Sequence, residues 1–322
     1  MARALVTGGQ GFIGGHLCRA LLERGDEVVV LDLPQAPGRA LALHGIAAEV
    51  ELVEGDVADR EVVDRATRGA DSVFHLAAQT LVGPAAEDPE GTFRSNVEGT
   101  WTVLEVCREA EVARVVVASS DKAYGPSESL PYHETDELRP AAPYEGSKAA
   151  ADVISRSYWN SWELPVAVTR LANVYGGGDL NFSRLIPELV TAYLADREPR
   201  IRSDGSPQRD FLHVSDAVSA YLVIESALPA AGGEAFNAGT GEPRSVAEVI
   251  AAVKAATGSD REPDFLSDRN PDGEIDSQYV DASKLTGATV WRPRATFADG
   301  IAEAVEWYRG FPDFAARAEA GS

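Results

Sequence analysis

The sequence predicts a doubly wound α/β fold, in which a parallel sheet carries helices on both faces and a second, smaller lobe follows. Apolar, β-branched runs alternate with helical patterns through the first half of the chain. Each run is apolar at successive positions, which is typical of parallel strands buried on both faces. Beyond residue 173 this alternation stops, and glycine and proline clusters interrupt the chain.

Composition and charge narrow the possible partners. The chain has 322 residues, of which 44% are hydrophobic and 25% charged, as in soluble globular proteins of about two domains. Lys and Arg number 29 and Asp and Glu 51, which gives a formal net charge of -22. Such a surface repels nucleic-acid phosphates and anionic lipids. We therefore expect neither nucleic acid nor a membrane as a partner.

The cysteines and the N-terminus point to the cytoplasm. Cys18 and Cys107 lie outside any CxxC or histidine-flanked cluster, so we expect two small buried hydrophobic side chains in a reducing compartment. The apolar run before the first glycines is too short for a secretory signal. No stretch approaches the roughly 18 apolar residues of a membrane-spanning helix.

The first half of the chain predicts strands and helices in turn. A buried strand is expected at 4–7, and a helix at 11–24 places Ile13, Leu17, Ala20 and Leu21 on its inner face. Further strands, rich in Val and Leu, are expected at 27–32, 50–53, 72–76, 113–119 and 166–171. The helices expected at 89–110 and 143–162 each begin at a proline, which suits a first helical turn.

The second half predicts the smaller lobe. Residues 176–179 form a turn cluster, and the helices expected at 185–195, 246–257 and 297–309 do not continue the alternation. Residues 210–227 are expected to return to the sheet. We therefore predict a first domain at 1–172 with about 209–238, and a second lobe at 173–208 and 239–322.

A glycine-rich turn lies between the first strand and the first helix, where a pyrophosphate can bind to the helix N-terminus. Gly8 allows the tight turn, Gly11 lets a phosphate approach the backbone, and Gly14 permits close helix–strand packing. The spacing is GxxGxxG rather than GxGxxG. The turn predicts a dinucleotide site.

Two acids extend this site. Asp32 ends the second strand, where it can accept hydrogen bonds from both ribose hydroxyls and would repel a 2′-phosphate, so NAD is favoured over NADP. The alternative is a solvated acid at a strand end. Asp56 follows the third strand and either meets adenine or is a turn aspartate.

A tyrosine and a lysine predict the catalytic base. Tyr144 and Lys148 share one face of a helix, and an ammonium beside a phenol lowers the pKa of that phenol. Tyr144 would then act as a general base near neutral pH. Ser120 follows the strand at 113–119, at the sheet edge where ligands bind. It can therefore hydrogen-bond the substrate hydroxyl from which Tyr144 would take a proton.

The glycine turn, Tyr144 and Lys148 belong to a set of motifs at 7–14 (TGGQGFIG), 75–79 (HLAAQ), 96–100 (NVEGT), 143–148 (PYEGSK), 170–176 (RLANVYG) and 209–211 (RDF). From residue 5 to about 309 the chain resembles the extended short-chain dehydrogenase/reductase superfamily, within it the nucleotide-sugar epimerases and dehydratases. The resemblance implies a Rossmann domain with NAD, a nucleoside-diphosphate sugar substrate bound by the second lobe, and a homodimer. The implied cofactor contacts, besides Tyr144 and Lys148, are Phe12, Ile13, Val57, Leu76, Ala77, Ala78 and Asn96.

The residues after Ser120 favour one reaction. By resemblance, 4-epimerases carry small or hydroxyl side chains there, dTDP-glucose 4,6-dehydratases carry Asp-Glu, and CDP-glucose 4,6-dehydratases carry Asp-Lys. Asp121 and Lys122 look like the last group. The glycine turn differs from the lysine-containing turn of those enzymes, which leaves the nucleotide open. A 4-epimerase and a non-catalytic NAD-binding protein are the alternatives.

The chemistry of a 4,6-dehydratase needs such a pair. Tyr144 takes the O4 proton while the C4 hydride passes to NAD⁺, and the 4-ketone then acidifies C5–H. Lys122 as base and Asp121 as acid would remove the C5 proton and protonate the departing O6, provided that burial and coupling shift both groups. The sequence leaves open which group does which step. The alternative is a surface ion pair.

Candidate substrate ligands lie mainly in the second half. Arg209 is the main diphosphate candidate, because a guanidinium suits phosphate oxygens. The resemblance adds Gln79, Asn173, Arg184 and Arg269.

The remaining expectations concern the histidines and the dimer. His75 and His213 are expected to be structural, and no metal is expected, since the histidines lack ligand spacing. By resemblance a dimer would form through the helices at 89–110 and 143–162. Their residues that suit either a core or a partner are Trp101, Leu104, Val153 and Ile154.

Overall fold

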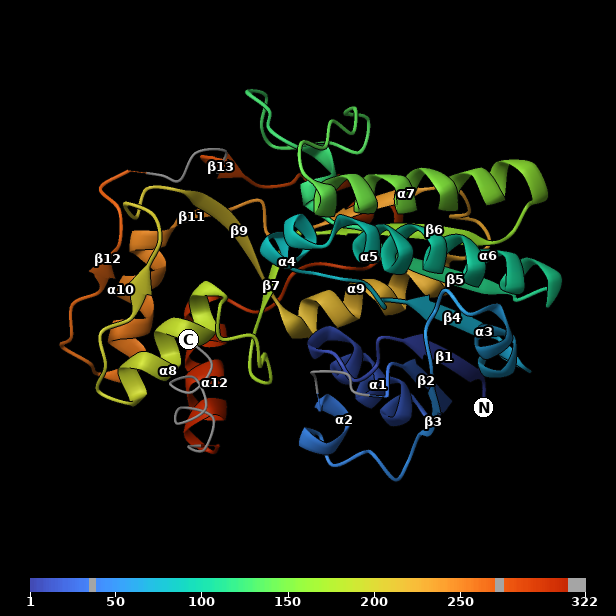
Figure 1. Ribbon diagram of the computed structural model, residues 1–322, viewed down its shortest axis with the longest axis horizontal. Coiled ribbons are helices and arrows are strands. Elements are labelled where there is room, and N and C mark those ends of the chain that lie inside the picture. Colours follow the sequence, from blue (N-terminus) through green and yellow to red (C-terminus); the bar gives the residue numbers. More distant parts are fainter. Residues whose placement is uncertain (35–38, 270–274, 312–322) are drawn as a thin grey trace.

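The computed structural model describes residues 1–34, 39–269 and 275–311, and its main layer is a parallel sheet (Figure 1). Seven strands follow the order β10-β6-β5-β4-β1-β2-β3. They are β1 (Arg3–Thr7), β2 (Glu27–Asp32), β3 (Glu51–Glu54), β4 (Ser72–His75), β5 (Arg114–Ala118), β6 (Val166–Leu171) and β10 (Ala235–Ala238). The chain reverses direction across the sheet between β1 and β4, which makes this the switch point where ligands bind in such folds. The predicted fold class is confirmed.

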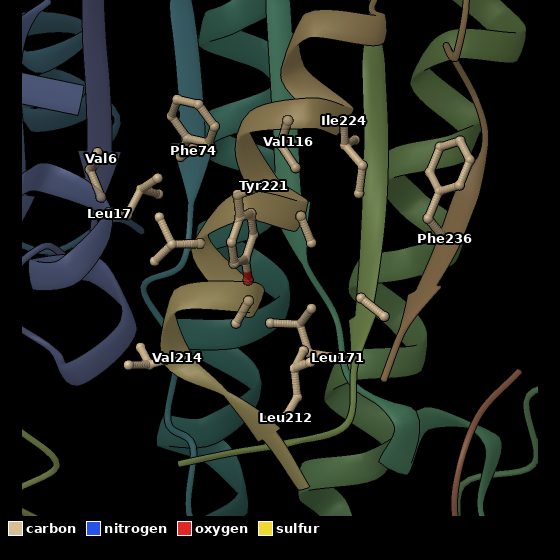
Figure 2. Close-up of a cluster of buried hydrophobic side chains, with 14 of the residues drawn as sticks. Val6, Leu17, Phe74, Val116, Leu171, Leu212, Val214, Tyr221, Ile224 and Phe236 are labelled. Carbon is tan, nitrogen blue, oxygen red and sulfur yellow. The ribbon is translucent and has the colours of Figure 1, made fainter. Parts of the chain in front are cut away.

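Helices cover both faces of the sheet (Figure 1). One face carries α1 (Phe12–Arg24) and α9 (Val214–Ala227), and the other carries α3 (Arg60–Thr67), α6 (Gly99–Glu109) and α7 (Pro143–Trp162). Adjacent strand residues serve different cores: Val116 packs with the α9 residues, whereas Val115 and Val117 pack with α6. Figure 2 shows Tyr221 and Ile224 of α9 against the sheet. This division explains why the strands are apolar at successive positions.

The predicted elements of the first half are present, with differences in one helix. The strands agree within about a residue at most ends, and the 143–162 helix agrees fully. The helix expected at 89–110 consists of α5 (Pro89–Phe93), a π-helical turn (Arg94–Glu98) and α6. The sequence interpretation missed α3, α4 (Val82–Glu87) and a 3-10 turn at Asp121–Tyr124. The start of α3 has a readable signal, because the Asp59 carboxylate accepts from Glu61 N and Val62 N.

A second group of elements, here the second lobe, packs beside the large sheet. Its small sheet contains β7 (Asn173–Tyr175), β9 (Gln208–His213), β11 (Pro243–Ser245) and β13 (Ser277–Gln278). Its core lies among α8 (Leu185–Leu194), α10 (Val246–Thr257) and α12 (Phe297–Arg309). Two further strands, β8 (Arg200–Ile201) and β12 (Asp264–Phe265), pair with each other.

The expected return of 210–227 to the large sheet is half right. Helix α9 packs on that sheet, but the strand before it, β9, lies in the small sheet, and β10 is the strand that joins the large one. The placement of the two strands follows from the polarity of their residues. β9 begins Gln-Arg-Asp and is partly exposed, whereas every residue of β10 is buried, as a strand within a two-sided core requires.

Two further observations concern the cysteines and the described helices. Cys18 and Cys107 are free and fully buried, as predicted. No helix among the described residues has the length and apolar character needed to cross a membrane.

Candidate active site

The glycine turn holds the N-terminus of α1 against the strand ends. Gly8 has φ 74°, which suits glycine. A Cβ on Gly14 would lie 2.2 Å from the Gly8 carbonyl oxygen, so glycine is required there for packing. A Cβ on Gly11 would meet only that same oxygen, at 3.2 Å, and no side chain caps α1. The first-turn amides and the open side of Gly11 therefore suit an approaching phosphate.

The turn also needs a glycine that the sequence interpretation did not assign. A Cβ on Gly9 would lie 2.7 Å from the Val30 side chain of the neighbouring strand. A Cβ on Gly8 would lie 2.8 Å from Ala77 N, so the segment after β4 packs directly on the turn. Leu76 N and Ala77 N both donate to the Thr7 hydroxyl, at 3.2 and 3.1 Å. Leu76 and Ala77 therefore lie beside the predicted cofactor site.

Asp32 is bound to the glycine turn. Its carboxylate accepts from Gln10 N at 2.9 Å and from Leu33 N at 2.8 Å. Burial raises the pKa of Asp32, and these two amides oppose the shift. Each oxygen keeps a lone pair for a ribose hydroxyl.

Asp56 is engaged within the protein. Its Oδ1 accepts from Ala58 N at 2.9 Å, and its Oδ2 lies 3.5 Å from Arg94 Nε. The neighbouring Val57 is buried against Gly99. Asp56 therefore has the turn role that was its alternative, and adenine contact remains a prediction.

His75 connects β4 to the rest of the site. Its Nδ1 lies 2.8 Å from the Thr7 hydroxyl and its Nε2 lies 3.1 Å from the Thr100 hydroxyl. Thr100 donates its own proton to Asn96 O, so it accepts from His75, and the imidazole is the neutral Nε2–H tautomer. Burial, with a contribution from Lys148, lowers the pKa of His75 to about 3. The structural role expected for His75 agrees with this geometry.

Asn96 lies in the π-helical turn and braces two segments. Its amide group donates to Gln79 O and to the Ser147 hydroxyl, at 2.9 and 2.8 Å. Its carbonyl accepts from Gln79 N at 2.7 Å and from Ser95 Oγ at 2.9 Å. All four hydrogen bonds of this side chain are thus made within the protein. Asn96 ties the segment after β4 to α7.

The expected catalytic group is assembled at the ends of β5 and α7. Ser120, Tyr144 and Lys148 are all buried. The Tyr144 phenol hydrogen-bonds Ser120, and Lys148 Nζ donates to Ala118 O at 2.8 Å. The lowered Tyr144 pKa expected from the sequence is not found: burial raises the pKa of Tyr144 to about 12 and lowers that of Lys148 to about 8. Desolvation disfavours both charges, and the Lys148 ammonium bonds a carbonyl rather than the phenol.

Asp121 and Lys122 lie in the 3-10 turn that follows Ser120. Asp121 is only 1% exposed, so the surface ion pair considered as an alternative is excluded. Its Oδ1 accepts from the Ser120 hydroxyl at 3.1 Å, and its Oδ2 has no partner among the described residues. Burial raises the pKa of Asp121; the charge of Lys122 and the Ser120 hydrogen bond oppose this, while the charge of Asp210 adds to it. The net effect shifts Asp121 toward its protonated form.

Lys122 contacts a residue that the sequence interpretation missed. Its Nζ donates to Gln278 Oε1 at 3.3 Å, across 156 residues of sequence. Gln278 lies on β13, a strand of two residues, which is too short to show a periodic pattern.

The expected substrate ligands differ in their surroundings. Arg209 lies on β9, close enough that its charge lowers the pKa of Asp121. The amide nitrogen of Asn173 is buried and has no partner among the described residues. Arg184 pairs with Asp179 at 3.1 Å and also influences Tyr144, which places it near the phenol.

Three further residues considered from the sequence, Gln79, Arg269 and His213, contact residues close to them in the chain. Gln79 Oε1 accepts from Leu81 N at 3.0 Å. Arg269 is exposed, and its backbone N–H donates to Ser267 at 3.2 Å. His213 Nδ1 contacts Ser215 Oγ at 2.8 Å at the start of α9, which is consistent with the structural role expected for it.

Comparisons with known proteins agree with this architecture. Residues 4–239 match the model of the NAD dependent epimerase/dehydratase family. The UDP-glucose 4-epimerase of Mycolicibacterium smegmatis is 35% identical over 95% of this chain and 98% of its own length. The dTDP-glucose 4,6-dehydratase of the same organism is 32% identical over 95% of this chain and 93% of its own length.

A solved structure extends the comparison to three dimensions. The dTDP-glucose 4,6-dehydratase DesIV of Streptomyces venezuelae, solved with NAD bound, has a TM-score of 0.89 and 32% identity, covering 97% of this chain and 98% of its own. The predicted family is therefore confirmed. Relatives of similar likeness catalyse two different reactions, so the resemblance alone does not choose between them.

The environment of His75 predicts a pH dependence of stability. Its folded pKa of about 3 lies below its ordinary value of 6.5, so the unfolded chain binds more protons between these values. The free energy of unfolding should fall as the pH drops below about 6.5, by at most about 1.4 kcal/mol per pH unit from this group. In urea unfolding at pH 7 and pH 5, His75→Gln should lose this component, while a His133→Gln control at an exposed position keeps it. Equal pH slopes for wild type and His75→Gln would refute the assignment.

Proposed function

This chain belongs to the NAD dependent epimerase/dehydratase family, and from that premise we propose that it is a nucleotide-sugar 4,6-dehydratase using NAD. The observation that carries the proposal is the acid–base pair of the buried Asp121 and the half-buried Lys122, next in sequence to the serine that hydrogen-bonds Tyr144. A C4 epimerisation needs oxidation at C4 and return of the hydride to the other face of C4, with no elimination. Elimination of water needs an additional acid and base, which this pair supplies.

The residues at the glycine turn fit NAD. The open amides of α1 and the missing Cβ of Gly11 suit the pyrophosphate, and the Asp32 carboxylate suits the adenosine ribose while repelling a 2′-phosphate. A related enzyme, DesIV, carries NAD in its structure. Bound NAD⁺ would accept a hydride from C4 of the sugar and return it to C6.

Tyr144 is the base for the oxidation. It takes the proton from O4 of the sugar. Ser120, which hydrogen-bonds the Tyr144 phenol, lies where it can bind the same sugar hydroxyl. Lys148 lies one helical turn away and is held by the Ala118 carbonyl, so its charge favours the phenolate form that Tyr144 must have before it accepts the O4 proton. The 4-ketone that results acidifies the proton on C5.

Asp121 and Lys122 carry out the elimination. The pKa of Asp121 is raised, so we assign to it the proton that goes to O6 as the C6–O6 bond breaks with release of water. Lys122 takes the C5 proton as the C5–C6 double bond forms. The hydride would return to C6 from the reduced nicotinamide, and Lys122, after exchange with solvent, would give a proton back to C5. The product is a 4-keto-6-deoxy sugar nucleotide.

The second lobe supplies the nucleotide contacts. Arg209 is the proposed diphosphate ligand. The Asn173 amide nitrogen, which has no partner among the described residues, lies on the same face of the small sheet, because Asn173 registers with Phe211, two residues from Arg209. Arg184 lies near Tyr144 and could reach the same phosphate or the sugar. The structural neighbours that bind nucleotide sugars support this arrangement; one is solved with UDP-glucose.

We also propose a homodimer through α6 and α7. Of the residues considered from the sequence, Leu104 is fully buried and Ile154 packs on the core, whereas Trp101 is 47% and Val153 58% exposed. A second copy of the chain would cover these two apolar side chains.

If α6 and α7 form the dimer interface, a charge introduced at Trp101 should weaken the dimer. Trp101→Glu should shift the sedimentation coefficient from that of a dimer to that of a monomer, since a buried carboxylate would be unpaired in the interface. Leu266→Glu, an exposed apolar position in the second lobe, is the matched control and should leave the dimer intact. A monomeric wild type, or a Trp101→Glu dimer, would contradict the proposal.

The reaction is tested with a panel of CDP-, dTDP-, GDP- and UDP-hexoses. We expect one donor to lose the mass of a single water on incubation with the enzyme and NAD, as measured by mass spectrometry. A product of unchanged mass but different sugar configuration would favour the 4-epimerase. An unchanged panel would favour the non-catalytic alternative.

The two steps should separate by mutation. Asp121→Asn and Lys122→Met should each slow water loss by about 10²- to 10⁴-fold, because each removes one partner of the proton transfers. Both variants should still form reduced nicotinamide on mixing with substrate, whereas Tyr144→Phe should lose that absorbance change too. Normal water loss by both pair variants would exclude the proposed roles.

A further inference from the structure

Gln278 is a fully buried polar residue that reaches the acid–base pair from the second lobe. It is 0% exposed and lies on β13, and its Oε1 accepts from Lys122 Nζ at 3.3 Å. We propose that Gln278 is a positioning residue for the elimination: its carbonyl holds the Lys122 amine in place, and its amide N–H group binds an oxygen of the hexose. This inference rests on the proposed 4,6-dehydratase activity.

The orientation of the amide follows from its partner. Lys122 Nζ donates to Gln278 Oε1, as both an ammonium and a neutral amine can, so the Gln278 oxygen faces Lys122 and the NH₂ group faces away from it. This NH₂ group is buried and has no partner among the described residues. A buried donor without an acceptor is unfavourable, so an acceptor is expected when the site is filled.

The position of β13 shows where that acceptor would lie. Gln278 registers with Arg209 on the neighbouring strand, so the two side chains share one face of the small sheet. The charge of Arg209 acts on Asp121, which places this face beside the acid–base pair. Asn173 lies on the same face and also has a buried amide nitrogen without a described partner. Two unsatisfied donors on one face suit a ligand rich in oxygen.

A neutral partner suits the chemistry of Lys122. The lysine must be uncharged to take the C5 proton, and an amide carbonyl fixes its direction without adding a negative charge. A carboxylate at the same place would stabilise the ammonium and oppose this role. Gln278→Glu changes that charge with almost no change of shape, so it separates positioning from packing.

The test measures water loss against pH in three variants. Gln278→Glu should move the acid limb of the pH–rate profile to higher pH by about one unit, which corresponds to an about tenfold loss on that limb and recovery at alkaline pH. Gln278→Met should lower kcat for water loss about tenfold and also raise KM, because both hydrogen bonds are lost. Ser277→Ala, next to it on β13, should leave the profile unchanged.

The reduced nicotinamide that forms when each variant is mixed with substrate reports the oxidation step. Its amount gives the fraction of folded, active sites. We expect this step to be retained in Gln278→Glu and Gln278→Met. A Gln278→Glu profile that overlays the wild type, or a loss of water release and oxidation by the same factor at every pH, would overturn the inference. If neither Gln278 variant forms reduced nicotinamide, Gln278 is required for the fold and the positioning role is likewise rejected. If the wild type releases no water, the proposed function itself fails.

Discussion

The buried ion pair between Arg170 and Asp152 is the constraint on which the proposed site depends. Arg170 Nε and Nη2 donate to the two carboxylate oxygens at 2.8 and 3.0 Å, joining β6 to α7. Arg170 Nη1 also donates to the Tyr124 hydroxyl at 2.8 Å, at the end of the turn that carries Asp121 and Lys122. Removing one charge would leave the other buried and unpaired, which typically costs about 3–5 kcal/mol. The helix with Tyr144 and the turn with the acid–base pair are therefore fixed to the same residue.

The same network reaches the second lobe. Tyr124 donates to Asn237 Oδ1 at 2.7 Å, and the Asn237 amide donates to Tyr132 O and Asp281 O at 2.9 and 3.1 Å. Asp281 follows β13 closely, so the strand that carries Gln278 is anchored to the turn that carries Lys122. The proposed oxidation and elimination thus use residues from separate elements that one buried polar network holds in place. Such fixed placement is what proton transfer at two adjacent carbons needs.

Much of this could be predicted from the sequence where the signal is local. Successive apolar residues predicted the strands of the large sheet, and a proline followed by Tyr144 and Lys148 predicted α7 and the residues at its start. Contacts between distant segments gave no such signal: nothing in the sequence links Arg170 to Asp152 or Lys122 to Gln278. The predicted direction of the Tyr144 pKa shift was wrong, because the shift depends on burial, which the four-residue spacing between Tyr144 and Lys148 does not reveal. The expected return of 210–227 to the large sheet was wrong for the strand before α9, for a related reason: the polar start of β9 became meaningful only by comparison with the fully buried β10.

The central claim is that hydrogen taken from C4 of a hexose comes back at C6 after Asp121 and Lys122 have expelled the hydroxyl. Substrate deuterated at C4 tests it most directly, with the position of the label in the product read by NMR. We expect deuterium at C6, transferred within one molecule, and solvent hydrogen at C5. Deuterium restored to C4, with the sugar keeping all its oxygens, would contradict it.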